Sequence, residues 1–445
     1  MKNHPTVQWF QNNKERLALD SSGEGVLDST MVRELARKAG ADDCGFASID
    51  SRALGTEKQE ILKLYPQAQA LISIVVKLNR DNVQAKSRSV SDHEFVLGFE
   101  GVSSVARKLA RLLSDIGVNV RHPSPGFPMD VSKWPGRMWT ISHKTTAIAA
   151  GMGQMGLNRL LIHPDFGNFI VLGTLVLDRG ISEYSSSLDY NPCIGCGLCA
   201  AVCPVGAVGA DGQFSFVNCM VHNYRDRMGG FSDWVENLVK SKSVKAYRAR
   251  VMDKETVSMW QSLTYGICNK SSYCMAACPA GKENIGEYLT DKKAYRDRVL
   301  KPLQENDEQV FVLPNSDGYD HVTKKYPHKQ ARLVGSGVRP VSAAGFLDSL
   351  ALVFQRKRSR GIDAVYQFSF SGDESVLGTV VIKDMAVQIM PGHVGQADIS
   401  IKADTRTWLK FLAKEKNLVL ALVTGKIKIK GNLKLMKDFV RCFPL

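Results

Sequence analysis

The organisation of this chain is decided by one run of cysteines, Cys193-x-x-Cys196-x-x-Cys199-x-x-x-Cys203-Pro204. This spacing is typical of bacterial ferredoxins, in which three thiolates hold three irons of one [4Fe–4S] cluster and the fourth turns away toward a second cluster. A second group follows with less regular spacing, Cys268-x5-Cys274-x3-Cys278-Pro279, and Cys219 lies between the two groups. Two cubane clusters need eight thiolates, and these segments together supply eight.

The crossover of ferredoxin ligands predicts which cysteines share a cluster. The first cluster would be held by Cys193, Cys196, Cys199 and Cys278. The second cluster would be held by Cys203, Cys219, Cys268 and Cys274. A zinc site is the alternative, but the first run followed by proline disfavours it. Without a secretory signal, clustered cysteines also hold metal more often than they form disulfides.

Length and composition bound the class of protein. The chain has 445 residues, of which 44% are hydrophobic, so we expect about three domains with sizeable cores and exclude a disordered or fibrous protein. The longest apolar runs, such as Ala70–Val76 and Leu418–Val423, are too short to span a bilayer. The N-terminus lacks the pattern of a secretory signal, so we expect a cytoplasmic protein and leave its oligomeric state open.

The net charge is +14. Residues 341–445 contain 16 basic and 9 acidic residues, so this last quarter carries half of the excess. Such a balance indicates nucleic acid, a membrane surface or an acidic partner, and the alternative is simply a solvated basic face.

Helices and strands alternate up to about residue 178. Three-to-four spacing of apolar residues predicts helices at 29–41, 102–116 and 145–150, and β-branched runs predict strands at 70–77 and 169–177. These elements indicate an α/β or α+β core. Gly151-x-Gly153-x-x-Gly156 has the letters of a dinucleotide fingerprint, but it follows a helical stretch rather than a strand, so we reject a nicotinamide site there.

A separate α+β domain is predicted after Pro340. We expect a helix at 342–356, strands at 364–370, 375–383, 385–390 and 396–403, a helix at 405–414, a strand at 426–430 and a helix at 432–443. Little regular structure is expected between 193 and 279, and residues 282–339 read as a surface helix and connector. The predicted divisions are 1–185, 186–285, 286–340 and 341–445.

A glycine-rich segment ahead of the cysteines makes the chain resemble one particular family of proteins. Its marks are Ala150-Gly151-Met152-Gly153-Gln154-Met155-Gly156-Leu157-Asn158, with Phe166-Gly167 and Leu172-Gly173 further on, followed by the cysteine groups in order. Over roughly residues 30–285, the chain resembles the corrinoid-dependent iron–sulfur reductases, which comprise the reductive dehalogenases and epoxyqueuosine reductase.

This resemblance implies a nitroreductase-like core that holds cobalamin without a protein ligand to cobalt. It also implies that the two [4Fe–4S] clusters reduce the corrinoid, which then acts on the substrate. The glycine segment would pass close to the corrinoid, where side chains would obstruct. The implied cofactor contacts are Gly151, Gly153, Gly156, Asn158 and Ser142.

The proton donor is where the sequence departs from its relatives. Epoxyqueuosine reductases place an aspartate before the glycine segment, but here that neighbourhood is Gly136-Arg137-Met138. Dehalogenases place a tyrosine nearby, and none lies between Tyr65 and Tyr184. Among the local polar residues, our catalytic candidates are His143, Lys144 and Arg137, because histidine titrates near neutrality and a cation stabilises a developing anion. Alternatively, His143 and Lys144 only contact the cofactor.

The last domain is similar to sterol-carrier-protein domains. The resemblance rests on two stretches, Ala397–Asp404 and Gly425–Leu433, the second followed by an amphipathic helix. It implies a sheet with helices over one face that enclose an apolar tunnel for lipids. A closed core that serves for dimerisation or docking is the alternative.

Three functions remain. The first is a cobalamin-dependent reductase, such as a reductive dehalogenase, that acts on a hydrophobic small molecule and receives electrons from an external ferredoxin or flavodoxin. The second is epoxyqueuosine reduction on tRNA, although we expect nucleic acid not to be the partner. The third is a non-catalytic electron-transfer or lipid-binding protein, and a flavin in the core is a minor alternative. We favour the first.

Overall fold

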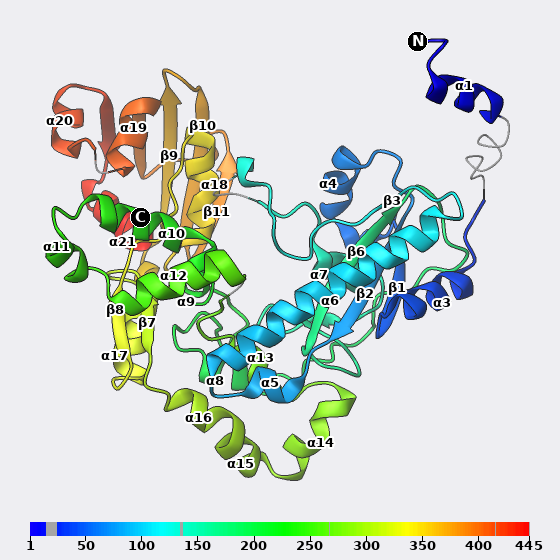
Figure 1. The fold of residues 1–445 in the computed structure, drawn as a ribbon. Helices are drawn as coiled ribbons and strands as arrows, with labels where there is room; N and C mark the ends of the chain where they lie inside the picture. Colours follow the sequence, from blue (N-terminus) through cyan, green and yellow to red (C-terminus); the bar gives the residue numbers. More distant parts are fainter. Residues whose placement is uncertain (15–24, 134–136, 267, 414, 445) are drawn as a thin grey trace.

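The computed structural model describes residues 1–14, 25–133, 137–266, 268–413 and 415–444 (Figure 1). The first helix, α1 (Pro5–Asn12), has no buried residue and stands away from the rest of the molecule in Figure 1. None of the described helices is both long and apolar enough to cross a membrane. The predicted mixture of helices and sheets, α+β, is confirmed.

The first sheet has the strand order β1-β2-β6-β3, and all its pairings are antiparallel. Its strands are β1 (Asp43–Ser48), β2 (Ala70–Lys77), β6 (Ile170–Leu177) and β3 (Val120–Arg121). Helices α3 (Ser29–Ala39) and α6 (Arg88–Ser114) cover one face, and α7 (His143–Ala149) covers the other. The sheet is therefore the middle of three layers.

Alternation along β2 explains why both faces are covered. Ile72 and Ile74 pack toward α3 and α6, whereas Leu71 and Val75 pack toward α7. Successive side chains of a strand point to opposite faces, so a continuous apolar run gives a strand that is buried on both sides. Shorter elements complete this part: η1 (Arg52–Leu54), α4 (Glu57–Leu64), α5 (Arg80–Gln84), η2 (Val131–Lys133), β4 (Gln154–Met155) and β5 (Leu161–Ile162).

Helices surround the cysteines. They are α8 (Leu198–Val202), α9 (Phe216–His222), η3 (Arg225–Arg227), α10 (Gly229–Val239), α11 (Val244–Arg248), α12 (Asp253–Tyr265) and α13 (Tyr273–Ala276). The expectation of little regular structure here was wrong for α10 and α12. Val257, Trp260 and Leu263 on α12 are exposed, so its apolar residues form no single buried stripe that the sequence would reveal.

The stretch after the second Cys-Pro is more structured than a connector. It contains α14 (Lys282–Thr290), α15 (Lys292–Tyr295), the π-helical turn η4 (Arg296–Leu300), α16 (Lys301–Gln304) and α17 (Asp317–Lys325). It also contains a parallel strand pair, β7 (Gln309–Val312) and β8 (Gln330–Leu333). Val310 and Val312 pack in one cluster with Cys203 and Val205, so this segment belongs to the wall of the cysteine region.

The C-terminal domain is a five-stranded sheet in the order β11-β10-β9-β12-β13. Its elements are α18 (Ala343–Val353), η5 (Lys357–Ser359), β9 (Ala364–Ser371), β10 (Val376–Lys383), β11 (Ala386–Pro391), β12 (Ile399–Asp404), α19 (Thr405–Leu412), α20 (Leu418–Val423), β13 (Ile427–Gly431) and α21 (Leu433–Cys442). The pairing of β9 with β12 is parallel and the others are antiparallel.

Aromatic rings fill the space between this sheet and its helices. The ring centroids of Phe346 and Trp408 are 5.3 Å apart, and those of Phe368 and Phe439 are 5.5 Å apart. The same cluster includes Met220 of α9, so the C-terminal domain shares one core with a helix of the cysteine region.

Candidate functional site

Four of the predicted ligands line one cavity. Cys193, Cys196, Cys199 and Cys278 surround it, together with residues of the glycine segment that include Asn158. The cavity therefore combines three cysteines of the first run with the last cysteine of the second group. This is the set predicted for the first cluster.

Burial makes these thiols poor acids while they are unligated. It raises the pKa of Cys199 to about 12, with a further contribution from Cys196, and it also raises the pKa of Cys278. A metal ligand must be a thiolate, so loss of these protons is favourable only when bound iron compensates for the charge.

The second predicted set is brought together in part. Burial raises the pKa of Cys219 well above its ordinary value, and the nearby thiols of Cys274 and Cys203 raise it further. Cys268 instead interacts with Asp92 and Asp226, and its Sγ lies 3.9 Å from the carbonyl oxygen of Gly266. Three of the four thiols thus face one another, and Cys268 lies beside residue 267, which is outside the described residues.

The two kinds of metal site differ in how their ligands are arranged. Within the described ranges, no three His, Cys, Asp or Glu side chains converge closely enough to hold one metal ion. Zinc needs its four ligands around one centre at about 2.3 Å from each sulfur. In a cubane each thiolate binds a different iron, so the ligands stand further apart. The preference for an iron–sulfur cluster rests on the ferredoxin spacing of the first cysteine run.

The glycine segment runs between α7 and the cysteines. Asn158 lines the first cavity, and its Nδ2 donates to the carbonyl oxygen of Cys274 over 3.2 Å. A Cβ on Gly151 would lie 2.5 Å from the Ser186 carbonyl oxygen, and one on Gly153 would lie 2.3 Å from that of Ile162. The glycines are thus required by contacts within the protein itself, and Asn158 joins this segment to both cysteine groups.

Two of the predicted residues before the glycine segment fix a loop. Arg137 makes two hydrogen bonds to Glu57, 2.8 and 3.0 Å long, and the same carboxylate accepts from the Ser142 backbone N–H over 2.7 Å. The Ser142 side chain accepts from the backbone N–H of Thr145 and so caps α7. Glu57 was not among the predicted site residues, because its contact with Arg137 joins distant parts of the chain and leaves no local pattern.

His143 and Lys144 point to different partners. The His143 Nε2 lies 2.8 Å from the Ser124 carbonyl oxygen, which can only accept, so Nε2 carries the proton and Nδ1 accepts from the Thr174 hydroxyl over 2.9 Å. Burial lowers the pKa of His143, which favours this neutral form. The Lys144 Nζ donates to the Arg159 carbonyl oxygen over 2.6 Å.

Among the predicted catalytic residues, Lys144 is the one that lies near the cysteines. Burial lowers the pKa of this ammonium group, and the neighbouring thiols of Cys219 and Cys274 oppose that effect. A second cation lies near these residues. The guanidinium of Arg227 is 5.5 Å from the ring centre of Phe127 and 5.0 Å from that of Tyr224. Arg227 therefore ties the loop before α7 to the helices of the cysteine region, a role the sequence did not suggest.

The residues predicted to contact a corrinoid do not form an open binding site for it. Gly151 and Gly153 are closed by backbone atoms, and the polar atoms of Arg137, Ser142 and His143 already have protein partners. The cysteine sites suit iron–sulfur clusters, whereas a corrinoid would need the loop before α7 to yield some of these contacts.

Two protein families match parts of the chain. A model of the 4Fe-4S binding domain matches residues 187–208, and a model of the SCP-2 sterol transfer family matches residues 352–444. Both the predicted [4Fe–4S] binding and the predicted sterol-carrier-like domain are thereby confirmed.

Among curated relatives, the epoxyqueuosine reductase of Lactococcus garvieae is 33% identical over 81 residues, which are 18% of this chain and 22% of that protein. The chain thus matches about a fifth of the length of that relative. An epoxyqueuosine reductase structure from Streptococcus thermophilus has a TM-score of 0.30 at 20% identity, covering 42% of this chain and 57% of that one. A catabolic reductive dehalogenase structure has a TM-score of 0.36 at 13% identity, covering 61% and 34%.

The chain therefore resembles the corrinoid- and iron–sulfur-dependent reductases that include epoxyqueuosine reductase, and it combines this likeness with a 4Fe-4S binding domain and a C-terminal SCP-2 domain.

Proposed function

We propose that the protein is a reductase in which two [4Fe–4S] clusters deliver electrons to a redox cofactor in the α+β core. One observation carries this proposal: Cys193, Cys196, Cys199 and Cys278 line a single cavity that the glycine segment also borders. The second set, with Cys219 and its neighbours, would then lie between that cavity and α7.

We propose cobalamin as the cofactor of the core, on the strength of the match to epoxyqueuosine reductases. The chemistry that a corrinoid supplies when bound is low-potential reduction of an activated bond. Residues 137–144 would be displaced in part to admit it, since their polar atoms are held within the protein.

Lys144 is the residue we propose to act beside the cofactor. Its ammonium group, on a half-buried side chain, lies near Cys219 and Cys274 and donates to a single carbonyl oxygen, that of Arg159. A cation at this position stabilises negative charge that develops on a substrate and holds a proton at Nζ. His143 and Arg137 would position the loop, because their hydrogen bonds already have internal partners.

The substrate we propose is a hydrophobic small molecule, with reductive dehalogenation as the reaction and the cytoplasm as its place. Large apolar side chains are exposed near the loop and on α12, among them Phe127, Trp139 and Trp260. Exposed apolar side chains mark a binding surface where they form one contiguous patch. The sterol-carrier-like domain would guide such a molecule.

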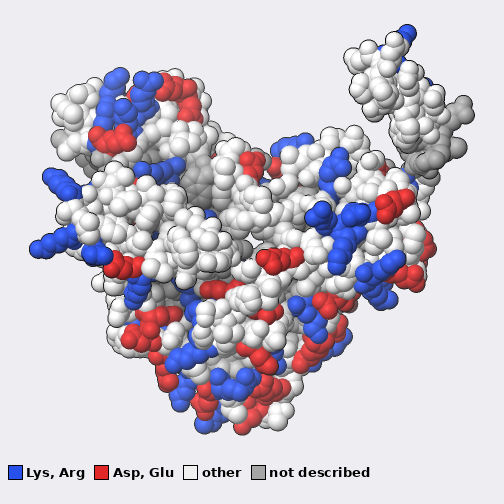
Figure 2. All heavy atoms as spheres, viewed as in Figure 1, with Lys and Arg blue, Asp and Glu red and all other residues white. Residues whose placement is uncertain are grey.

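Epoxyqueuosine reduction on tRNA is the second candidate, because the curated relatives bear that name. A specific observation also favours it. Exposed cations with no ion pair among the described residues lie on the neighbouring helices α3 and α6, namely Arg37, Lys38, Arg107, Lys108 and Arg111. Figure 2 shows Lys and Arg gathered over this side of the molecule. Unpaired cations on one surface attract a phosphate backbone.

The experiment that tests the proposal compares two substrates in the reconstituted protein under a chemical reductant. Release of halide from an apolar aryl halide supports the first candidate, and conversion of epoxyqueuosine in tRNA supports the second. If neither substrate reacts although both clusters are filled, the protein is an electron carrier or lipid-binding protein, which was our third alternative.

A further inference from the structure

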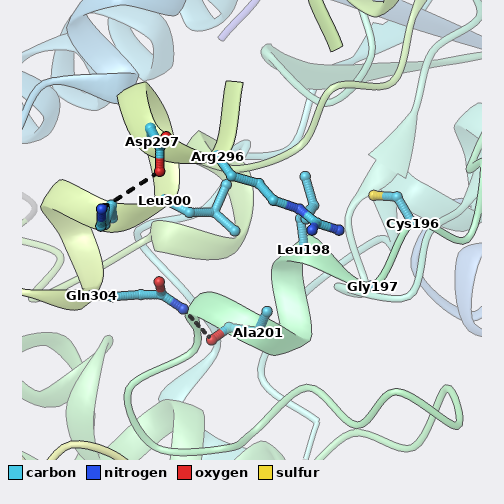
Figure 3. Close-up of a pocket in the computed structure, with 9 residues that line it drawn as sticks. Cys196, Gly197, Leu198, Ala201, Arg296, Asp297, Leu300 and Gln304 are labelled. Carbon is cyan, nitrogen blue, oxygen red and sulfur yellow. Dashed lines mark hydrogen bonds and ion pairs between the residues drawn. The ribbon is translucent and has the colours of Figure 1, made fainter. Parts of the chain in front are cut away.

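A hollow opens to the surface beside the first cysteine cavity. Its volume is about 420 Å³, and Cys196, Gly197 and Leu198 form one wall. The opposite wall comes from η4 and α16, with Arg296, Leu300 and Gln304 (Figure 3). Cys196 and Gly197 line both this hollow and the cavity of the four predicted ligands, so the two share part of one wall.

The charge in the hollow is positive and available. Figure 3 shows the guanidinium group of Arg296 directed toward Cys196. Its neighbour Asp297 is held by Lys293 at 2.9 Å and by Lys301 at 3.6 Å, so that carboxylate is already balanced. Arg296 is exposed and has no ion pair among the residues that the structure describes. An arginine of this kind binds an incoming carboxylate in a two-pronged geometry.

The rim of the cysteine loop is apolar. Ile194 is 49% exposed and Tyr190 is 52% exposed, and Ile194 also borders the cavity of the four cysteines. Contact surfaces between proteins combine aromatic and aliphatic anchors with arginine, and a charged rim steers the approach of the partner. The position of Arg296 in a π-helical turn is also notable, because such turns occur frequently at functional sites.

The two cysteine groups give the electron path a direction. Cys219 and Cys274, which belong to the second predicted set of ligands, lie near Lys144, whereas Cys196 of the first set lines this open hollow. An electron donor therefore has access to the first set of ligands, and the second set is the one near Lys144.

We propose that this surface, formed by Ile194, Cys196 and Arg296, is the docking site of an acidic one-electron carrier protein. A carboxylate of the carrier pairs with Arg296, and its apolar contact covers Ile194. One electron leaves the carrier, which is oxidised, and reduces the iron–sulfur site held in part by Cys196, with no bond made or broken. The inference rests on the proposed function, because it requires iron at Cys196.

The test measures binding of the cluster-loaded protein to a purified bacterial ferredoxin and, in a second arm, to a purified flavodoxin. In Arg296→Glu we expect the Kd for the carrier to rise at least about tenfold at low ionic strength, and the difference to shrink in high salt. Arg360→Glu is the matched control, because it makes the same charge change at an exposed arginine of the C-terminal domain that has no ion pair among the described residues, and it should change the Kd less than about twofold.

Reduction by dithionite, a small molecule that needs no docking surface, distinguishes a variant with damaged clusters from a variant with a damaged docking site. Arg296→Glu should be reduced by dithionite at the wild-type rate, which shows intact clusters. Equal Kd values for Arg296→Glu and Arg360→Glu with both carriers would overturn the docking site. Absence of iron from the wild-type protein would instead overturn the proposed function.

Discussion

A single buried histidine fixes the helix that carries Cys219. The His222 side chain is fully buried on α9, and its Nδ1 accepts from the Phe311 backbone N–H over 3.4 Å. Burial, together with the nearby cations Lys270 and Lys329, lowers the pKa of His222 to about 3. The imidazole is therefore neutral in the folded protein throughout the physiological range.

This histidine predicts a loss of stability in acid. The unfolded chain binds a proton to His222 below its usual pKa of about 6.5, while the folded protein does not until pH approaches 3. Stability that is present above pH 6.5 should then fall by up to about 1.4 kcal/mol per pH unit as the pH drops. His222→Asn keeps an acceptor near Nδ1, so its unfolding free energy, measured from pH 7 to 4.5, should fall less steeply than that of the wild type. Parallel curves would contradict this account.

Among single residues, the sequence predicted which cysteines lie together better than it predicted individual side-chain contacts. The ferredoxin spacing is local, so Cys193, Cys196 and Cys199 were expected in one place, and Cys278 joined them as the crossover requires. The pair of Glu57 with Arg137 joins residues 80 positions apart and carries no periodic signal. For the same reason nothing in the sequence shows that adjacent His143 and Lys144 face different partners.

The glycine segment is the element that joins the core to the cysteines. Gly153 has φ +152, which L side chains rarely adopt, and a Cβ there would meet the Ile162 carbonyl oxygen at 2.3 Å. The segment is therefore shaped by a close approach to β5 as well as by its backbone conformation.

Gly153→Ala should be more damaging than its backbone conformation alone explains. Gly55 also has a positive φ, +52, but a Cβ there would meet no atom within 4 Å. Both alanine variants lose about 1–3 kcal/mol through the backbone, and Gly153→Ala should lose a further ~1–3 kcal/mol through the collision. Urea unfolding of both variants measures the difference. Equal losses would show that the segment relaxes freely.

Elements with one apolar face were predictable, and elements without one were not. The run at Ala70–Lys77 has the same bounds in the structure, because a strand buried on both sides is continuously apolar. Helix α6 begins at Arg88, well before the predicted start, since its early buried positions include Ser91, Glu94 and Gly98. These residues interrupt the apolar spacing that a helix prediction needs.

Helix α9 is one of the elements that join the C-terminal domain to the cysteine region. Met220 and Val221 of this helix share a hydrophobic cluster with Phe346 and Leu350 of the C-terminal domain, and Cys219 lies on the same helix. The sterol-carrier-like domain therefore packs against the helix that carries Cys219, a member of the second predicted set of ligands.

Removal of residues 341–445 should therefore disturb the second iron–sulfur site. Exposure of the apolar face of α9 leaves Cys219 without its packing, so we expect the iron content per chain to fall toward about half, while the first cluster remains. Iron analysis with electron paramagnetic resonance of the reduced protein measures this. Unchanged iron and an unchanged melting temperature would show that the two parts are energetically independent.

The most direct test of the whole account is the iron and cobalt content of the protein after anaerobic purification and reconstitution with cobalamin. We predict about eight irons and about one cobalt per chain, as two [4Fe–4S] clusters and one corrinoid require. Full iron without cobalt would contradict the corrinoid-dependent reductase and would leave the cysteine groups as an electron-transfer module.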